Sequence, residues 1–334
     1  MSDGLDIRLR WTIAAALVLA ALVTWGKAGF FGQSLLAELA IFAIFAMSVD
    51  LVAGLVGLMS IGHAMYFGFG AYAVALLTTE LGVSAGTALL LAVAGAAVVA
   101  ALVGAVIVRF SEIIFIMLTL ALSEMFYAFI FGNRTLGGSD GIAGVPRLDL
   151  SPIGLDGEAP EVFSAVTVVA AVITFALLDA LARSPFGLVA AAVRQKPSRA
   201  RALGTRINLV RTVVYALSAA LAALAGALMA QLNNFASPDL AGWTLSGLVL
   251  IMAILGGLGS ISGAALGAII VQAASHFLSR WTGYWGFFLG VSFIAVVMFA
   301  ENGLFALLRR PFVRRAARLL PGPEVAMPPV EAGR

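Results

Sequence analysis

Apolar residues fall into long runs along this chain, and short polar or glycine-rich segments separate the runs. Runs of roughly 20 apolar residues predict helices that cross a lipid bilayer. Glycines interrupt the third run and the region of the eighth and ninth. The pattern predicts an all-α polytopic membrane protein of about ten transmembrane helices, some of them broken at glycine. The expected spans are 11–30, 35–53, 57–79, 86–108, 112–132, 161–182, 212–232, 243–258, 262–279 and 285–308.

The composition excludes a water-soluble domain. Of the 334 residues, 62% are hydrophobic and 11% are charged, whereas a soluble domain carries about 25% charged residues. The net charge of +3 suggests nucleic acid at first, but the basic residues lie between spans, where they follow the cytoplasmic side of a membrane. We therefore expect no nucleic-acid partner. The chain has no cysteine and two histidines, His63 and His276, so we expect no disulfide, no metal and no cofactor.

The basic residues also predict the orientation of the chain. With ten spans, sixteen of the twenty Lys and Arg residues fall on one side, together with both chain ends. The other side holds the remaining four and the acidic loop 133–160. The positive-inside rule makes both termini cytoplasmic. We expect one transmembrane domain at 1–310 and a cytoplasmic tail at 311–334, whose basic part lies on lipid headgroups and whose Pro-rich part is disordered.

Residues 183–211 form the most basic loop of the chain. Ser184 suits the N-cap of a helix, and Pro185 suits its first position, where the missing N–H costs nothing. Pro197 is expected to end this helix, and Gly204 to end a second short one. Such a helix fits a groove of another protein, and it equally fits the headgroup layer of a membrane. Its apolar stripe comprises Phe186, Val189 and Val193. The basic residues are Arg183, Arg194, Lys196, Arg199, Arg201, Arg206 and Arg211.

Nucleotide-driven transport by this chain would need a second protein. A phosphate-binding Walker loop requires the pattern G-x-x-x-x-G-K-[ST]. The chain has two lysines, Lys27 before Ala28 and Lys196 before Pro197, and neither fits that pattern. The chain is therefore not expected to be an ATP-hydrolysing enzyme, and separate ATPase subunits would have to drive it.

Four segments carry a resemblance to a known family. They are GLVGLMSIGHAMYFGFGAYAVALL (54–77), GGSDGIAGVP (137–146), RSPFG through AVRQKPSRARALG (183–204) with YALSAALAALAGALMA (215–230), and LVLIMAILGGLGSISGAALGA (248–268). In this order they resemble the branched-chain amino acid ABC transporter permeases of the LivM type, over about residues 35–310. The resemblance is weaker for the solute, because similar permeases carry urea and other small solutes.

The resemblance implies a permease subunit of an ABC importer for branched-chain amino acids in a bacterial inner membrane, with 183–211 as the segment that couples it to the ATPases. It also implies three kinds of partner: a second, LivH-type permease subunit, two cytoplasmic ABC ATPase subunits, and a periplasmic amino-acid-binding protein. Many relatives carry an acid in the coupling segment, but residues 195–199 here hold none. The implied coupling residues are Ser184, Pro185, Phe186, Gly187, Val193, Arg194, Arg199, Leu203 and Gly204.

A second polar group lies in the glycine-rich segment 57–72. Ser60, His63 and Tyr66 recur every three residues, so we expect them to share one face of a helix. Glycines at membrane depth allow close helix contact or a local break, and both suit a translocation path. The alternative is that Ser60 and His63 only hydrogen-bond neighbouring helices. The expected path residues are Ser60, Gly62, His63, Tyr66, Gly68 and Glu124.

Two short segments of the chain resemble each other. Residues 57–64 (GLMSIGHA) and 257–264 (GLGSISGA) share Gly, Leu, Ser, Ile and Ala in register. The match suggests an internal repeat with a glycine-broken helix at each site. Chance similarity in a chain rich in Gly, Ala and Leu is the competing explanation.

Acidic residues within the spans define a rival function. Glu38, Asp50, Glu124 and Asp179 lie in or near apolar runs, and ionisable groups at membrane depth are costly and commonly functional. An ion-coupled secondary transporter would use such groups as ion sites. Three of them, however, lie near the ends of their spans, where water reaches them. An intramembrane protease built on Ser60 and His276 is rejected, since nothing in the sequence places the two together.

Overall fold

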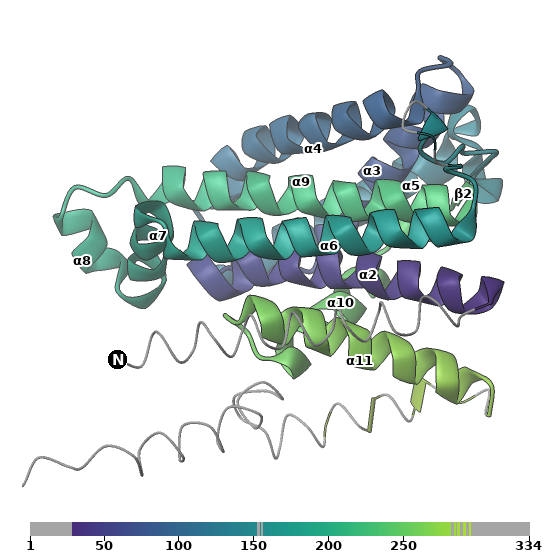
Figure 1. The fold of residues 1–334 in the computed structure, drawn as a ribbon. Helices are drawn as coiled ribbons and strands as arrows, with labels where there is room; N and C mark the ends of the chain where they lie inside the picture. Colours follow the sequence, from purple (N-terminus) through teal and green to yellow (C-terminus); the bar gives the residue numbers. More distant parts are fainter. Residues whose placement is uncertain are drawn as a thin grey trace, which may run out of the picture.

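The computed structural model describes residues 29–151, 154, 156–281, 284, 286–287, 290–291 and 294, and within them the chain is mostly helical (Figure 1). The main helices are α2 (Phe30–Asp50), α3 (His63–Thr79), α4 (Ala85–Ile107), α5 (Glu112–Gly132), α6 (Pro160–Arg183), α9 (Ile207–Asn233), α10 (Trp243–Gly256) and α11 (Ile261–Ser279). Two short helices, α7 (Pro185–Gln195) and α8 (Pro197–Ala202), follow α6. The short elements are the π-helical turn η1 (Leu51–Val56), the 3₁₀ turns η2 (Arg134–Leu136), η3 (Gly138–Asp140) and η5 (Pro238–Ala241), and the strands β1 (Ile142–Ala143) and β2 (Phe235–Ala236).

The helices follow the predicted spans. Within the described residues, six helices are long and apolar enough to cross a membrane, counting α2 with η1 as one. Helix α10 is apolar but only 14 residues long, and α3 has 17 residues. These eight correspond to the second through ninth predicted spans. The first predicted span, 11–30, and the tenth, 285–308, fall outside the described residues apart from a few positions.

The predicted start of the third span is wrong. Residues 57–62 are not helical, and α3 begins only at His63. Gly57 has a φ of +75°, a left-handed conformation that ends the preceding π-helical turn. Ser60 therefore precedes the helix and does not share a helical face with His63 and Tyr66. The break that the glycines predicted is present, but it lies at the beginning of the span.

Opposite ends of the bundle carry different segments (Figure 1). Helices α7 and α8 lie at one end, and β2 lies at the other. There β1 pairs antiparallel with β2, with Ile142 opposite Ala236, which ties the loop 133–160 to the end of α9. The all-α prediction holds for the described residues except for this pair of two-residue strands.

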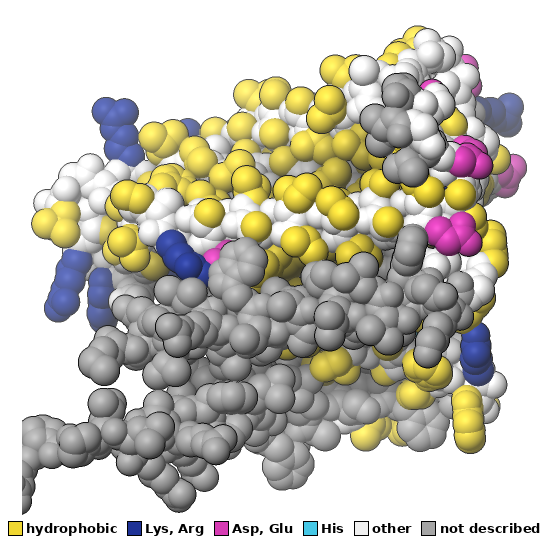
Figure 2. Space-filling view, viewed as in Figure 1, with side chains coloured by type: hydrophobic (Ala, Val, Ile, Leu, Met, Phe, Trp, Pro, Cys, Tyr) yellow, Lys and Arg dark blue, Asp and Glu magenta, His cyan; other side chains and the backbone are white. Residues whose placement is uncertain are grey.

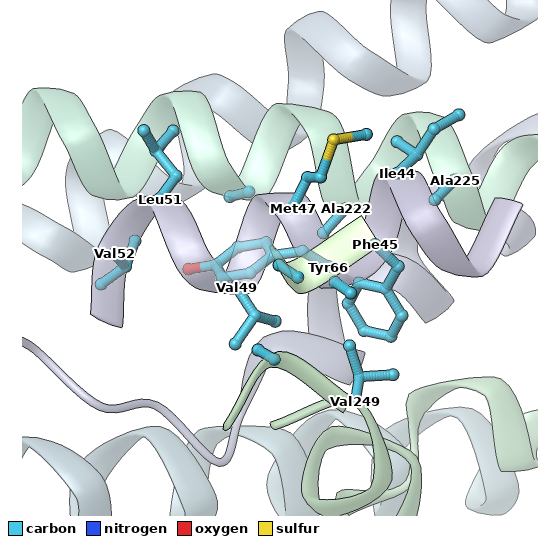
Figure 3. Close-up of a cluster of buried hydrophobic side chains, with 14 of the residues drawn as sticks. Ile44, Phe45, Met47, Val49, Leu51, Val52, Tyr66, Ala222, Ala225 and Val249 are labelled. Carbon is cyan, nitrogen blue, oxygen red and sulfur yellow. The ribbon is translucent and has the colours of Figure 1, made fainter. Parts of the chain in front are cut away.

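Helix α2 is the centre of the bundle. In its apolar window 89% of the residues are buried, against 22% in α5, and it packs against α6, α9, α10 and α11. Figure 3 shows Met47 beside Ala222 and Ile44 beside Ala225, both alanines of α9, while Phe45 lies near Val249 of α10. The small alanine side chains let α9 come close to α2, which is how helices associate where lipid removes the hydrophobic driving force.

The surface matches a protein that lies in a membrane. Figure 2 shows hydrophobic side chains forming a broad band along the helices, with Lys and Arg side chains projecting at the end that carries α7 and α8. Most Asp and Glu side chains on this face lie at the opposite end. Helices α4 and α5 expose large apolar side chains, among them Leu90, Leu102 and Met117. An exposed apolar surface of this kind suits contact with lipid or with another apolar helix.

Candidate functional site

A tight turn joins α6 to the short helix α7. Ser184 is the N-cap of α7, and its hydroxyl accepts a hydrogen bond of 3.1 Å from the Gly187 amide. Pro185 occupies the first helical turn. A Cβ on Gly187 would lie 2.3 Å from the Leu181 carbonyl oxygen, so only glycine allows α7 to start so close to the end of α6. The predicted N-cap at Ser184 and the proline in the first turn are confirmed. The close approach of the Leu181 carbonyl explains why residue 187 is a glycine.

Helices α7 and α8 have an inner and an outer face. Val193 and Ala200 are buried in the main core of the bundle, and Phe186 packs against that core. The outer face exposes Leu188 and Leu203, at 65% and 87% of their surface. Two residues of the predicted apolar stripe, Phe186 and Val193, therefore attach the segment to its own bundle, whereas the third, Val189, is exposed at 38%. Leu188 and Leu203 remain exposed for a partner.

The two helices end as the sequence predicts. Helix α7 stops at Gln195, and Pro197 opens α8. Helix α8 ends before Gly204, which has a φ of +85°. This conformation favours glycine and turns the chain back toward α9. Arg199 lies exposed on α8.

Arg194 at the end of α7 points back toward the bundle. Its guanidinium Nη1 donates a hydrogen bond to the Gly54 carbonyl oxygen, in the π-helical turn after α2. Close to this bond, Asp50 is 2% exposed, and its Oδ1 accepts a hydrogen bond of 2.7 Å from the Gly259 amide between α10 and α11. The basic segment 183–211 thus reaches two breaks in the helical bundle.

A polar cluster joins α2, α3 and α9 inside the bundle. His63 Nε2 lies 2.7 Å from Ser218 Oγ, and the Ser218 hydroxyl donates at 2.5 Å to the Ser48 carbonyl oxygen. Because the one hydroxyl proton of Ser218 goes to Ser48, His63 Nε2 must be the donor to Ser218. His63 Nδ1 is then an acceptor, and it has no hydrogen-bond partner among the described residues.

The start of α3 is held by side chains from other segments. Ser246 of α10 accepts a hydrogen bond of 2.7 Å from the Ala64 amide, one of the amides that a helix start leaves unpaired. A Cβ on Gly62 would lie 2.1 Å from the Thr119 carbonyl oxygen of α5, and Gly68 packs against Ala241 of η5. These glycines serve close contacts within the chain.

Tyr66 completes the cluster. Its hydroxyl donates at 3.2 Å to the Tyr215 hydroxyl of α9, and the two rings meet edge to face at 5.6 Å. Ser60, His63 and Tyr66 are all buried by the chain itself, with Ser60 Oγ accepting from the Gly62 amide at 3.3 Å. In this arrangement His63 and Tyr66 join α3 to α9, whereas Ser60 holds the turn before α3. The place of all three on a translocation path stays a prediction.

The acidic residues of the spans have defined surroundings. Glu38 of α2 lies 2.7 Å from both Gln272 Nε2 and His276 Nε2 of α11. Asp179 forms an ion pair with Arg183 one turn later in α6. The acids are therefore bound to groups of the bundle, which disfavours their use as ion sites. The fourth acid differs, since Glu124 is exposed on α5.

Sequence reasoning missed the partners of these residues. Ser218, Tyr215 and Ser246 lie in apolar runs far along the chain from His63 and Ala64. The available signal was a small set of polar residues within those runs, since such groups commonly bond to another helix. Their pairing depends on which helices meet.

This bundle of apolar helices, with broken helices inside it and a short helix pair at one end, is that of a polytopic membrane transport protein. The chain belongs to the family described as the branched-chain amino acid transport system permease component, which matches residues 33–297. It is thus a multi-pass membrane permease subunit of that family, and the resemblance read from the sequence is confirmed.

Two curated proteins are similar to the chain. One is the high-affinity branched-chain amino acid transport system permease protein LivM of Escherichia coli, 27% identical over an alignment of 330 residues that covers 92% of this chain and 77% of the relative. The other is the protein of the same name from Salmonella typhimurium, 26% identical over the same shares. No solved structure matches the chain at a comparable level.

Proposed function

We propose that this chain is the transmembrane permease subunit of an ABC importer that carries branched-chain amino acids across a bacterial inner membrane. Both LivM relatives have this transport in their names. The chain would work with a second, LivH-type permease subunit, two cytoplasmic ABC ATPase subunits and a periplasmic amino-acid-binding protein. ATP hydrolysis belongs to the ATPase subunits in this proposal.

One observation carries the coupling part of the proposal, namely the two-faced α7–α8 segment. Its inner face is anchored by Val193 in the core, while Leu188 and Leu203 lie exposed beside the basic residues of the same segment. Exposed leucines on a short basic helical segment, one in α7 and one just after α8, suit the groove of a partner protein. The segment is attached to α6 and α9 at its two ends, so force applied to it reaches two long helices.

Charge supports the orientation. The end that carries α7 and α8 holds the basic residues of 183–211, and the loop 133–160 lies at the other end. The positive-inside rule then places α7, α8 and both termini in the cytoplasm, and β1 and β2 in the periplasm. The ATPases and the binding protein would meet opposite ends of the bundle.

Glu124 supports a location for the translocation path. It lies on the exposed side of α5, near Met117 and Met125, which are about equally exposed at 64% and 63%. A carboxyl group facing lipid at this depth is costly, so this side of α5 would face the second permease or a hydrated path. Gly62, at the start of α3, rests on Thr119 on the buried side of α5, so α5 would lie between α3 and a path on that exposed side.

The proposal is tested with the reconstituted complex in proteoliposomes. Uptake of labelled leucine and of urea is measured with and without ATP and binding protein. We expect leucine uptake that needs both. Accumulation without ATP, driven by a proton gradient, would instead identify a secondary transporter, and urea uptake alone would identify a different solute.

The docking surface is tested by Leu203→Asp. Because Leu203 is 87% exposed, the thermal stability of the subunit should not change. Truncating an interface anchor costs about 2 kcal/mol or more, so ATPase binding should weaken about 30-fold. The matched control is Leu81→Asp, another strongly exposed leucine (70%), which lies in the turn between α3 and α4. Full uptake in the Leu203 variant would contradict the docking assignment.

A further inference from the structure

The side chain of Arg194 touches both glycine-broken segments of the bundle. Its Nη1 donates to the Gly54 carbonyl oxygen. Its aliphatic part passes over Gly57, where a Cβ would lie 3.0 Å from Arg194 Cγ. On the other segment, a Cβ on Gly259 would lie 3.1 Å from Arg194 Nη1. Side chains at Gly57 or Gly259 would therefore crowd the arginine.

The two segments also touch each other beneath the arginine. A Cβ on Gly54 would lie 2.6 Å from both the Gly259 nitrogen and Asp50 Oδ1. The Asp50 carboxylate is the acceptor for the Gly259 amide. Broken helices leave backbone amides and carbonyls unpaired, and these need partners where water is scarce. Here a buried carboxylate satisfies one amide and a guanidinium satisfies one carbonyl.

These segments are the two stretches that resemble each other in sequence. Gly57 and Gly257 occupy the same position of the shared pattern, and their φ angles are +75° and +114°. Each follows the end of a helix and precedes another, α3 in the first case and α11 in the second. The structure therefore gives the sequence similarity a spatial counterpart, since both breaks meet at one arginine of the coupling segment.

We propose that Arg194 is a positioning residue that clamps the two broken-helix joints together, so that a movement of α7 shifts the end of α2 and the start of α11 at the same time. In this role the guanidinium acts inside the permease and does not contact the ATPase. The inference rests on the proposed function, because it assigns to Arg194 the transmission of the ATPase stroke.

The proposed clamp depends on the directionality of the hydrogen bond from Arg194 to the Gly54 carbonyl oxygen. Val193 holds α7 by apolar packing, which is not directional. A hydrogen bond from a charged donor weakens steeply when its angle changes, and it is stronger than a bond between neutral groups. Coupling between distant sites is carried by such packed and hydrogen-bonded connections. Loss of the arginine should therefore loosen the connection of α7 to the joints while leaving α7 attached.

The experiment compares Arg194→Gln and Arg194→Lys with the wild-type complex in proteoliposomes, measuring leucine imported per ATP hydrolysed. Arg109→Gln is the matched control, because Arg109 lies just after α4 and its Nε donates to the Ala105 carbonyl oxygen of that helix. We expect about a tenfold lower ratio in the Gln variant, from the loss of a hydrogen bond to a charged group. ATP hydrolysis should continue, the Lys variant should be intermediate, and the control should be unchanged.

A second measurement keeps the inference falsifiable if the variant complex does not assemble. Amide exchange of residues 254–264 is followed by mass spectrometry in the purified full-length chain. Arg194→Gln should exchange faster there than the wild type and Arg109→Gln. Unchanged exchange, or an unchanged import ratio in a working complex, would overturn the clamp alone. A wild-type complex without ATP-dependent leucine uptake would overturn the proposed function, and the transmission role with it.

Discussion

The crossing of α3 and α9 is the place where one added methyl group should have a large effect. A Cβ on Gly226 of α9 would lie 1.8 Å from the Phe67 carbonyl oxygen of α3. On the other side of the crossing, a Cβ on Gly70 would lie 2.0 Å from the Ala223 carbonyl oxygen. Both neighbours are backbone atoms, so no side-chain rotation relieves the contact. Gly226→Ala therefore forces the two helices apart.

The size of the effect follows from two opposing contributions. Raising 1.8 Å to the 3.0 Å below which real Cβ atoms essentially never occur requires a shift of 1.2 Å. Overpacking of this kind costs about 1–3 kcal/mol, and a rigid backbone neighbour places Gly226 at the upper end. Replacing glycine by alanine within a helix stabilises the helix by about 1 kcal/mol through its higher helix propensity. The steric cost is larger, so we expect net destabilisation of about 1–2 kcal/mol.

The assay is denaturation of the purified full-length chain in detergent. Gly247→Ala is the matched control, because Gly247 also lies within a helix but a Cβ there meets nothing within 4 Å. We expect a lower midpoint for the Gly226 variant and an equal or higher midpoint for the control. Equal midpoints for the two variants would refute the reasoning from the close backbone contact.

Two further predictions concern hydrogen bonds that hold segment ends. Ser246→Ala removes the acceptor of the Ala64 amide and should destabilise the chain by about 1–2 kcal/mol; Thr244→Ala, at an exposed position of the same helix, should be near neutral. Arg147→Ala removes donors to the carbonyls of Gln231, Leu232 and Glu158. If Arg147 anchors the end of α9 through these bonds, residues 231–236 should show faster amide exchange in the variant. Exchange unchanged from the wild type would argue against this anchoring role.

The turn chemistry of the basic segment 183–211 could be predicted because it is local. Ser184 and Gly204 act within a few residues of themselves, as a helix cap and a left-handed turn. The sequence could not predict whether the apolar side of α7 packs against the chain's own bundle or against a partner protein. Phe186, Val189 and Val193 make an apolar stripe whether it covers the chain's own bundle or a partner. The packing of Val193 in the core decides this question.

The glycines also illustrate which features could be predicted from the sequence and which required the structure. The sequence predicted breaks in the third span and near the eighth and ninth, since glycine runs weaken a helix. It did not show that Gly57 ends a π-helical turn, nor that residues 57–62 are not helical. That outcome depends on contacts with Thr119 and Arg194, which come from α5 and α7.

The sequence by itself determined the class of protein, the approximate places of the second to ninth spans and the local shape of the basic segment, because hydropathy, charge and turn residues act along neighbouring positions. Only the tertiary structure decided which helices meet, that Ser218 reaches His63, and that Arg194 joins two breaks separated by about two hundred residues. The physical reason is that these contacts are made across helices, where small residues permit close approach and the partner of a polar group is set by packing.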